Sequence, residues 1–99
     1  MTPRLKMKKS IFTNKAPAAL GPYSQAIQWG DVVFISGQIP LNPLTGELNN
    51  QTFKDQAVQV IDNLEAICNE AGGNLDNILK LTIFLTDLST FLTIEPVWK

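Results

Sequence analysis

Short apolar runs alternate with turn residues in the first part of the chain. Residues 26–29 and 32–36 are rich in β-branched and aromatic side chains, and Gly30-Asp31 separates them. Such runs are typical of strands, and a two-residue connection with glycine first favours a type II′ turn. A further short strand is predicted at residues 9–13. This part of the chain therefore predicts a strand followed by a β-hairpin.

A helical pattern follows a loop that is rich in proline and asparagine. Apolar side chains recur every three or four positions between residues 53 and 71, as on the buried face of a helix. Thr52, with Asp55 three positions later, resembles a capping box. The glycines after residue 71 favour a left-handed cap that ends the helix. The pattern predicts that the buried side chains include Phe53, Ile61, Leu64 and Ile67.

The stretch ILKLTIFL at residues 78–85 is β-rich and almost wholly apolar. Its length and composition predict a strand that is covered on most of both faces. Asp87 is a suitable N-cap for a second helix starting near Leu88, and Pro96 should disturb that helix late in its course. Helices on one face of a sheet make an α+β domain. No residues remain for strands after the second helix, so we expect a domain that lacks its last strands.

The composition fits one globular domain, because 99 residues of which 44% are hydrophobic can form only one modest core. Five of the eight cations lie in the first fifteen residues, and we assign residues 1–9 to a basic N-terminal arm and residues 10–99 to the domain. Such an arm can touch nucleic acid or anionic lipid, although most untethered termini are simply solvated. The remaining body is acidic, which makes nucleic acid an unlikely partner.

The absence of histidine excludes a Ser-His-Asp triad and a Cys/His metal site. A single cysteine, Cys68, cannot form an internal disulfide, which favours a reducing, cytoplasmic compartment. No apolar run reaches the ~20 residues that span a bilayer, and the basic start lacks the apolar core of a signal peptide. We therefore expect no membrane partner.

Polar turns flank the predicted hairpin on both sides. Residues 21–25 (GPYSQ) precede it and residues 36–40 (SGQIP) follow it. Residues of these types are common in plain turns, and a turn is the simpler interpretation. The alternative is that the two segments shape a ligand pocket.

Several short motifs recur in a characteristic order between about residue 7 and residue 98. They comprise Ala16-Pro17, Gly21 to Ala26, Ser36 to Pro40, Pro43 to Glu47, Gln56, Gln59, Asn63, Ala71-Gly72, Lys80, Thr82, Phe84, Asp87 and Phe91. Each motif is weak alone. Together they resemble the RidA family, which is also called YjgF or L-PSP.

The resemblance implies a fold like that of bacterial chorismate mutase, with a mixed sheet backed by two helices, here C-terminally shortened. It also implies a homotrimer with pockets between subunits, which hydrolyses reactive enamines and imines such as 2-aminoacrylate to 2-keto acids and ammonia. No cofactor and no metal are implied. The alternatives are a non-catalytic, small-ligand-binding or regulatory trimer, and an endoribonuclease or translation inhibitor, which the acidic body disfavours.

By the same resemblance, the substrate-binding residues are Tyr23, Ser36 and Gly37. Tyr23 offers an amphipathic wall, Gly37 lets the backbone approach a ligand closely, and Ser36 with nearby backbone amides can hold a carboxylate or orient water. Glu95 stands where the family has a pocket asparagine, and its charge would repel a carboxylate substrate. The family's carboxylate-clamping arginine has no counterpart, because the only arginine is Arg4. No residue is therefore assigned as catalytic, and we expect impaired activity.

Overall fold

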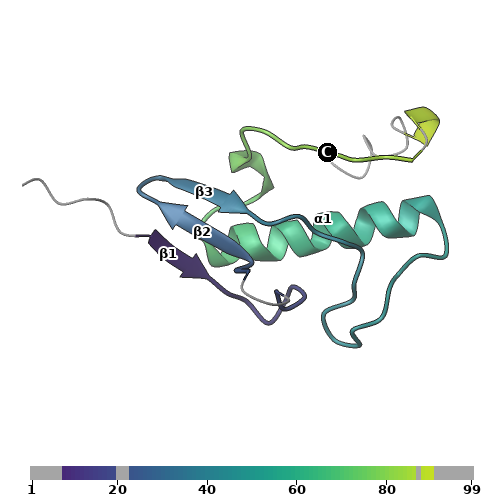
Figure 1. Ribbon diagram of the computed structural model, residues 1–99, viewed down its shortest axis with the longest axis horizontal. Coiled ribbons are helices and arrows are strands. Elements are labelled where there is room, and N and C mark those ends of the chain that lie inside the picture. Colours follow the sequence, from purple (N-terminus) through teal and green to yellow (C-terminus); the bar gives the residue numbers. More distant parts are fainter. Residues whose placement is uncertain (1–7, 20–22, 87, 91–99) are drawn as a thin grey trace, which may run out of the picture.

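The computed structural model describes residues 8–19, 23–86 and 88–90. Within them, a three-stranded antiparallel sheet in the order β1-β2-β3 lies against one long helix, α1 (Figure 1). The strands are β1 (Lys8–Ile11), β2 (Ala26–Trp29) and β3 (Val32–Ile35), the helix is α1 (Phe53–Glu70), and short 3₁₀ turns are η1 (Leu75–Asn77) and η2 (Leu88–Thr90). The predicted α+β class is confirmed, and β1 begins inside the stretch assigned to the basic arm.

The hairpin of β2 and β3 has the predicted two-residue turn. Trp29 is paired with Val32 across it, so Gly30 and Asp31 are the two central residues. Gly30 has a φ of 60°, whereas Asp31 is not among the residues with positive φ. Positive φ at the first central residue alone is the requirement of a type II′ turn, which only glycine meets without strain.

Helix α1 is capped at both ends, and at its start one half of the predicted capping box is present. At its start, the Thr52 hydroxyl oxygen accepts a hydrogen bond from the Asp55 amide at 3.0 Å. At its end, Gly72 has a φ of 93°, and the Gly73 amide donates to the Cys68 carbonyl at 2.9 Å. This return bond is the mark of a Schellman motif, which uses a left-handed glycine to satisfy carbonyls of the last helical turn.

The core lies between one face of the sheet and the C-terminal half of α1. Ile11 and Ala26 face each other across β1 and β2, and both are buried with Ala16 and Ile67 in one apolar cluster. The partly buried residues around this cluster are Val33, Ile35, Ala66 and Ala71. Alternation along the strands thus turns every second side chain toward the helix, as a half-buried sheet requires.

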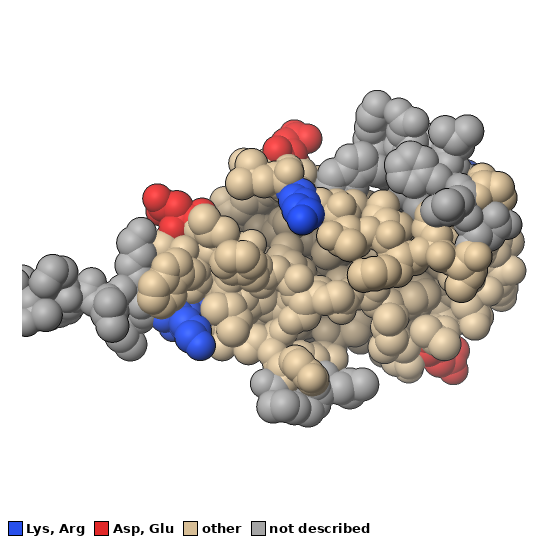
Figure 2. All heavy atoms as spheres, turned by 45° about the horizontal axis from the view of Figure 1, so that its top comes forward, with Lys and Arg blue, Asp and Glu red and all other residues tan. Residues whose placement is uncertain are grey.

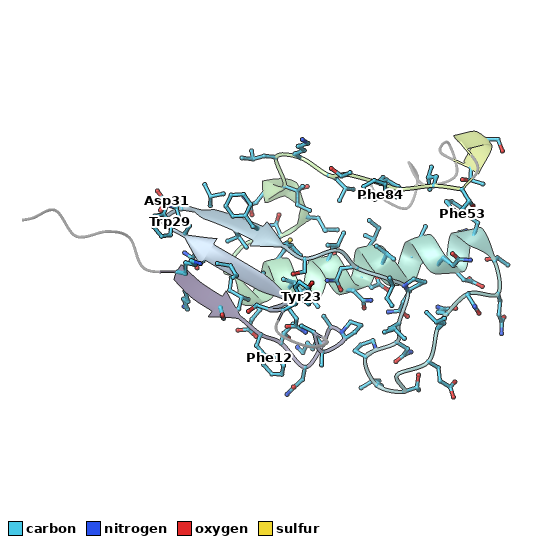
Figure 3. All side chains as sticks on the ribbon, viewed as in Figure 1. Phe12, Tyr23, Trp29, Asp31, Phe53 and Phe84 are labelled. Atoms are coloured by element: carbon cyan, nitrogen blue, oxygen red, sulfur yellow. The ribbon has the colours of Figure 1, made fainter. Side chains whose placement is uncertain are left out.

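Three of the four side chains predicted to be buried in the helix are buried. Ile61 and Leu64 are 7% exposed and Ile67 is wholly inaccessible. Phe53 is only half-buried, which corrects the prediction for that residue. It occupies the first turn of α1, beyond the part that the sheet covers (Figure 3).

Residues 78–85 do not form the predicted strand. They are extended without a ladder, and within the described chain the only backbone bond from an amide of this segment is that from Ile78 to Leu75. Leu79 is 96% exposed and Phe84 is 93% exposed, so the expectation of cover on both faces is wrong. The composition suits a strand, but a strand exists only beside a hydrogen-bonded neighbour. The described sheet is accordingly antiparallel throughout rather than mixed.

The second predicted helix falls mostly outside the described residues. Leu88–Thr90 form a 3₁₀ turn, whereas Asp87, Glu95 and Pro96 lie outside the described chain, as do residues 1–7 with Arg4. Among the described helices, none is long and apolar enough to cross a membrane.

Candidate ligand site

The two polar turns meet at the end of the hairpin that lies opposite Gly30-Asp31. The Ser36 amide donates to the Gln25 carbonyl at 3.0 Å, and the Ser36 hydroxyl donates to the Ser24 carbonyl. Ser24 is the direct neighbour of Tyr23 in the chain. Figure 3 shows Tyr23 at this end of the sheet and Trp29 with Asp31 at the other end. The structure therefore joins Ser36 to Ser24 and Gln25, the residues that directly follow Tyr23 in the chain.

Tyr23 presents both an aromatic face and a hydroxyl to solvent. Its side chain is 72% exposed, which is high for an aromatic residue. The hydroxyl has no hydrogen-bond partner among the described residues. An aromatic ring with an unused hydroxyl can form one wall of a ligand site while its oxygen contacts a polar ligand atom or water.

Gly37 is not required by the fold around it. Its φ is outside the left-handed region, and a Cβ built on it would meet no heavy atom of the described chain within 4 Å. Neither backbone conformation nor neighbouring protein atoms therefore demand glycine here. The open space on the side where a side chain would stand leaves room for a ligand to reach the backbone closely.

Backbone amides, rather than the Ser36 hydroxyl, are the free donors of this site. The amides of Gly37 and Gln38 have no acceptor among the described residues. The Ser36 hydroxyl already donates its single proton to the Ser24 carbonyl, so its oxygen remains available only as an acceptor. From the sequence, we expected Ser36 and nearby backbone amides to bind a carboxylate together. In this geometry only the amides have a proton free to donate to it.

Two buried amide side chains hold the turns in place, and sequence reasoning did not identify their role. Gln25 is 3% exposed; its Oε1 accepts from the Thr13 amide at 2.7 Å, and its Nε2 donates to the Pro17 carbonyl at 2.8 Å. Asn63 donates from α1 to carbonyls of the segment after Ser36. For Asn63, the available signal was a polar residue at a position that helical spacing places on the apolar face; Gln25 lies outside the helix and gave no such signal.

Titratable groups contribute little to the chemistry of this region. Burial, and secondarily the nearby Glu65 carboxylate, raise the pKa of the Cys68 thiol above its ordinary value. The thiol therefore stays protonated at neutral pH and is a weak nucleophile. Within the described parts of the chain, no group of three or more acidic, cysteine or histidine side chains could hold a metal ion. Glu95 and Arg4, named from the sequence, lie outside those parts.

This chain matches a known protein family and is similar in sequence to several of its relatives. The family model described as Endoribonuclease L-PSP matches residues 13–99. A RutC family protein of Pyrococcus abyssi is 46% identical over 92 residues, which are 93% of this chain and 72% of that protein. TdcF of Escherichia coli, whose name describes a reactive intermediate deaminase, is 47% identical over 93 residues, which are 94% of this chain and 71% of TdcF.

Solved structures are similar over the same extent. RidA from an Antarctic Psychrobacter species is 49% identical with a TM-score of 0.84, over 90% of this chain and 72% of that chain. The crystal structure of Escherichia coli TdcF with bound serine is 46% identical with a TM-score of 0.84, over 91% of this chain and 70% of that chain.

Proposed function

Because this chain belongs to the Endoribonuclease L-PSP family, the RidA family that its motifs resemble, we propose that it serves the hydrolysis of reactive enamines and imines. The substrates are of the 2-aminoacrylate type and the products are 2-keto acids and ammonia. The deaminase name of TdcF and the serine bound in its crystal structure support a small amino-acid-like ligand. A cytoplasmic location fits this chemistry and the single cysteine.

The observation that carries the proposal is the open backbone at Gly37. The fold gives no reason for glycine there, and the Gly37 and Gln38 amides are unused within the described chain. Two adjacent backbone amides without a protein acceptor can bind a carboxylate oxygen. The aromatic face of Tyr23 would then stand beside the remainder of a three-carbon substrate.

Hydrolysis of an activated imine needs little more than a positioned water molecule. Water adds to the imine carbon to give a carbinolamine; the C–N bond then breaks, ammonia leaves and the carbonyl forms. The Ser36 oxygen, whose proton is engaged by Ser24, is suited to accept a hydrogen bond from that water. Positioning of this kind lowers the barrier chiefly through orientation, so the chemistry requires neither histidine nor a strong nucleophile.

We expect the 99-residue chain to be a weak catalyst, because its only arginine is Arg4. Losing a buried charged contact to a carboxylate commonly costs about 2–5 kcal/mol, or roughly two to four decades in rate. The assay is ammonia release from an imine generated in situ by an amino-acid oxidase. Its reference is the same chain extended by a family-like ending that contains Pro-Ala-Arg. Equal rates, together with slower rates for Tyr23→Phe and Ser36→Ala, would contradict the arginine argument and leave the pocket complete.

The proposed assembly is a homotrimer with ligand pockets between subunits. The face of the sheet away from α1 carries four apolar side chains, here called the open sheet face: Ile27, Trp29, Val32 and Phe34. Phe34 is 66% exposed, and the cross-strand pairs Ile27–Phe34 and Trp29–Val32 join the four into one patch. Contiguous apolar patches of this kind are usually covered by another protein surface.

A non-catalytic ligand-binding or regulatory trimer is the second candidate, favoured by the single arginine at Arg4. Ligand binding without turnover in the assay above would support it. The endoribonuclease activity in the family's name is a weaker candidate. On the face drawn in Figure 2, the described lysine side chains are scattered rather than gathered, whereas affinity for nucleic acid depends mainly on clustered cations that meet phosphates.

A further inference from the structure

Asn63 is a buried polar residue on the apolar face of α1. It is 1% exposed, and its neighbours on that face include Leu64 and Ile67. Its Oδ1 accepts from Gln59 Nε2 at 3.0 Å. Its Nδ2 donates to the carbonyls of Ile39 and Leu41 at 3.3 and 3.0 Å. Both amide protons and the carbonyl oxygen are therefore engaged, so the group is buried without an unpaired atom.

The segment that Asn63 holds is a tight turn immediately after the ligand site. The Leu41 amide donates to the Ile39 carbonyl at 2.7 Å, and the Asn49 amide donates to the Pro40 carbonyl at 2.7 Å. Together with the two bonds from Asn63, these contacts occupy the carbonyls of three successive residues. The segment therefore has one defined path along α1.

Gly37 and Gln38 lie between two fixed points. On one side, Ser36 is bound through its amide and its hydroxyl to the segment before β2. On the other side, Ile39 is bound by Asn63. The backbone amides of Gly37 and Gln38 make no hydrogen bond within the described chain. The bonds of Ser36 and Ile39 fix the backbone on either side of them. The direction of these amides depends on where the Asn63 clamp places Ile39.

We propose that Asn63 is a positioning residue for the ligand site, and that Gln59 fixes the orientation of its amide. The proposal rests on the function proposed above. An apolar side chain at position 63 would pack in the core without any hydrogen bond to satisfy. The amide instead selects one position of the loop, and through it the direction of the donors that receive the ligand carboxylate. Errors of about 1 Å in such a position can cost about a hundredfold in rate.

The test removes the donor of the hydrogen bond from Gln59 Nε2 to Asn63 Oδ1. Gln59→Glu replaces the donor with a carboxylate oxygen that faces the Asn63 oxygen, so the Asn63 amide is expected to turn or withdraw. Gln56→Glu is the matched control: the same change on the same helix, at a half-buried side chain with no partner among the described residues. The readouts are the backbone amide resonances of Gly37 and Gln38, and their titration with L-serine and with pyruvate.

Gln59→Glu should shift both resonances in the ligand-free protein and weaken L-serine or pyruvate binding by about tenfold or more. The control should do neither. Affinity should recover as the pH falls from about 7 toward about 5, because a glutamic acid in a half-buried site takes up a proton above its ordinary pKa of about 4.3 and can again donate. Gln59→Met removes the donor without a charge; it should weaken binding at both pH values, and it serves if Gln59→Glu folds poorly.

Two patterns would overturn the proposal while leaving the proposed function intact: unchanged affinity in both Gln59 variants, or equal weakening in Gln59→Glu and its control. Failure of both the unmodified chain and the chain extended by the ending with Pro-Ala-Arg to bind L-serine or pyruvate is a different pattern. It would overturn the proposed function and the role of Asn63 with it.

Discussion

Gly37 differs from the other turn glycines because the fold does not require glycine at its position. Many turn glycines in small domains serve the backbone, as Gly30 and Gly72 do here with their positive φ values. Gly37 has neither a positive φ nor a close protein neighbour among the described residues. In the proposed ligand site, its value would lie in the space beside it, which a ligand could use.

Gly37→Ala is expected to weaken ligand binding without harming the fold. The added methyl group enters open space, so the free energy of unfolding should change by no more than about 0.5 kcal/mol, while L-serine affinity falls by about tenfold. Gly72→Ala is the opposite control. Its left-handed backbone should cost about 1–2 kcal/mol of stability and leave the affinity unchanged. Thermal unfolding and ligand titration of both variants distinguish the two roles; a strongly destabilised Gly37→Ala would contradict the prediction.

At the scale of elements, the sequence was sufficient for features whose interacting residues lie close together in the chain. The type II′ turn at Gly30 and the caps of α1 depend on residues a few positions apart, and the sequence predicted all of them. The prediction of a strand at residues 78–85 was wrong, because a strand depends on a neighbouring strand that its own sequence does not specify. The clamp formed by Asn63 escaped notice for the same reason: its partners lie 22 and 24 positions away in the chain.

The buried stripe of α1 can be tested with one truncation. Leu64→Ala should lower the free energy of unfolding by about 2–5 kcal/mol, because a buried leucine loses its contacts and leaves a cavity. Asp62→Ala, an exposed position on the same helix, should change it by less than about 0.5 kcal/mol. Denaturant unfolding measures both. A Leu64→Ala protein as stable as the parent would mean that this face of the helix is not the core.

At the scale of the whole molecule, the sheet has one covered face and one open face. The covered face packs on the C-terminal half of α1, whereas the open sheet face carries Ile27, Trp29, Val32 and Phe34. The sequence alone could predict alternation in these strands, but in β2 and β3 apolar side chains occupy both sets of alternate positions, with Gln28 as the one polar side chain. It therefore could not tell which face meets the helix, nor where a pocket between subunits would lie.

Phe34→Glu should reduce the proposed trimer to smaller species. A carboxylate on the open sheet face would lose its water on association, and burial of an unpaired charge costs several kcal/mol. Leu44→Glu is the control, since Leu44 is 90% exposed in the loop between β3 and α1. Light scattering coupled to size exclusion gives the mass of each. A parent chain that is monomeric would contradict the proposed assembly, and a trimeric Phe34→Glu protein would contradict this interface.

Association through exposed apolar side chains, such as the proposed trimer would provide, would make the stability of this chain depend on its concentration. Within the described chain, Leu79 and Phe84 of the extended segment at residues 78–85 are almost fully exposed, and association with other copies or with binding proteins would bury them. By mass action, any partner that binds the folded form alone stabilises it in proportion to the logarithm of its free concentration. The melting temperature is then a property of the solution as much as of the molecule. A dilute cellular pool and a concentrated purified sample of the same protein would differ in how readily they unfold.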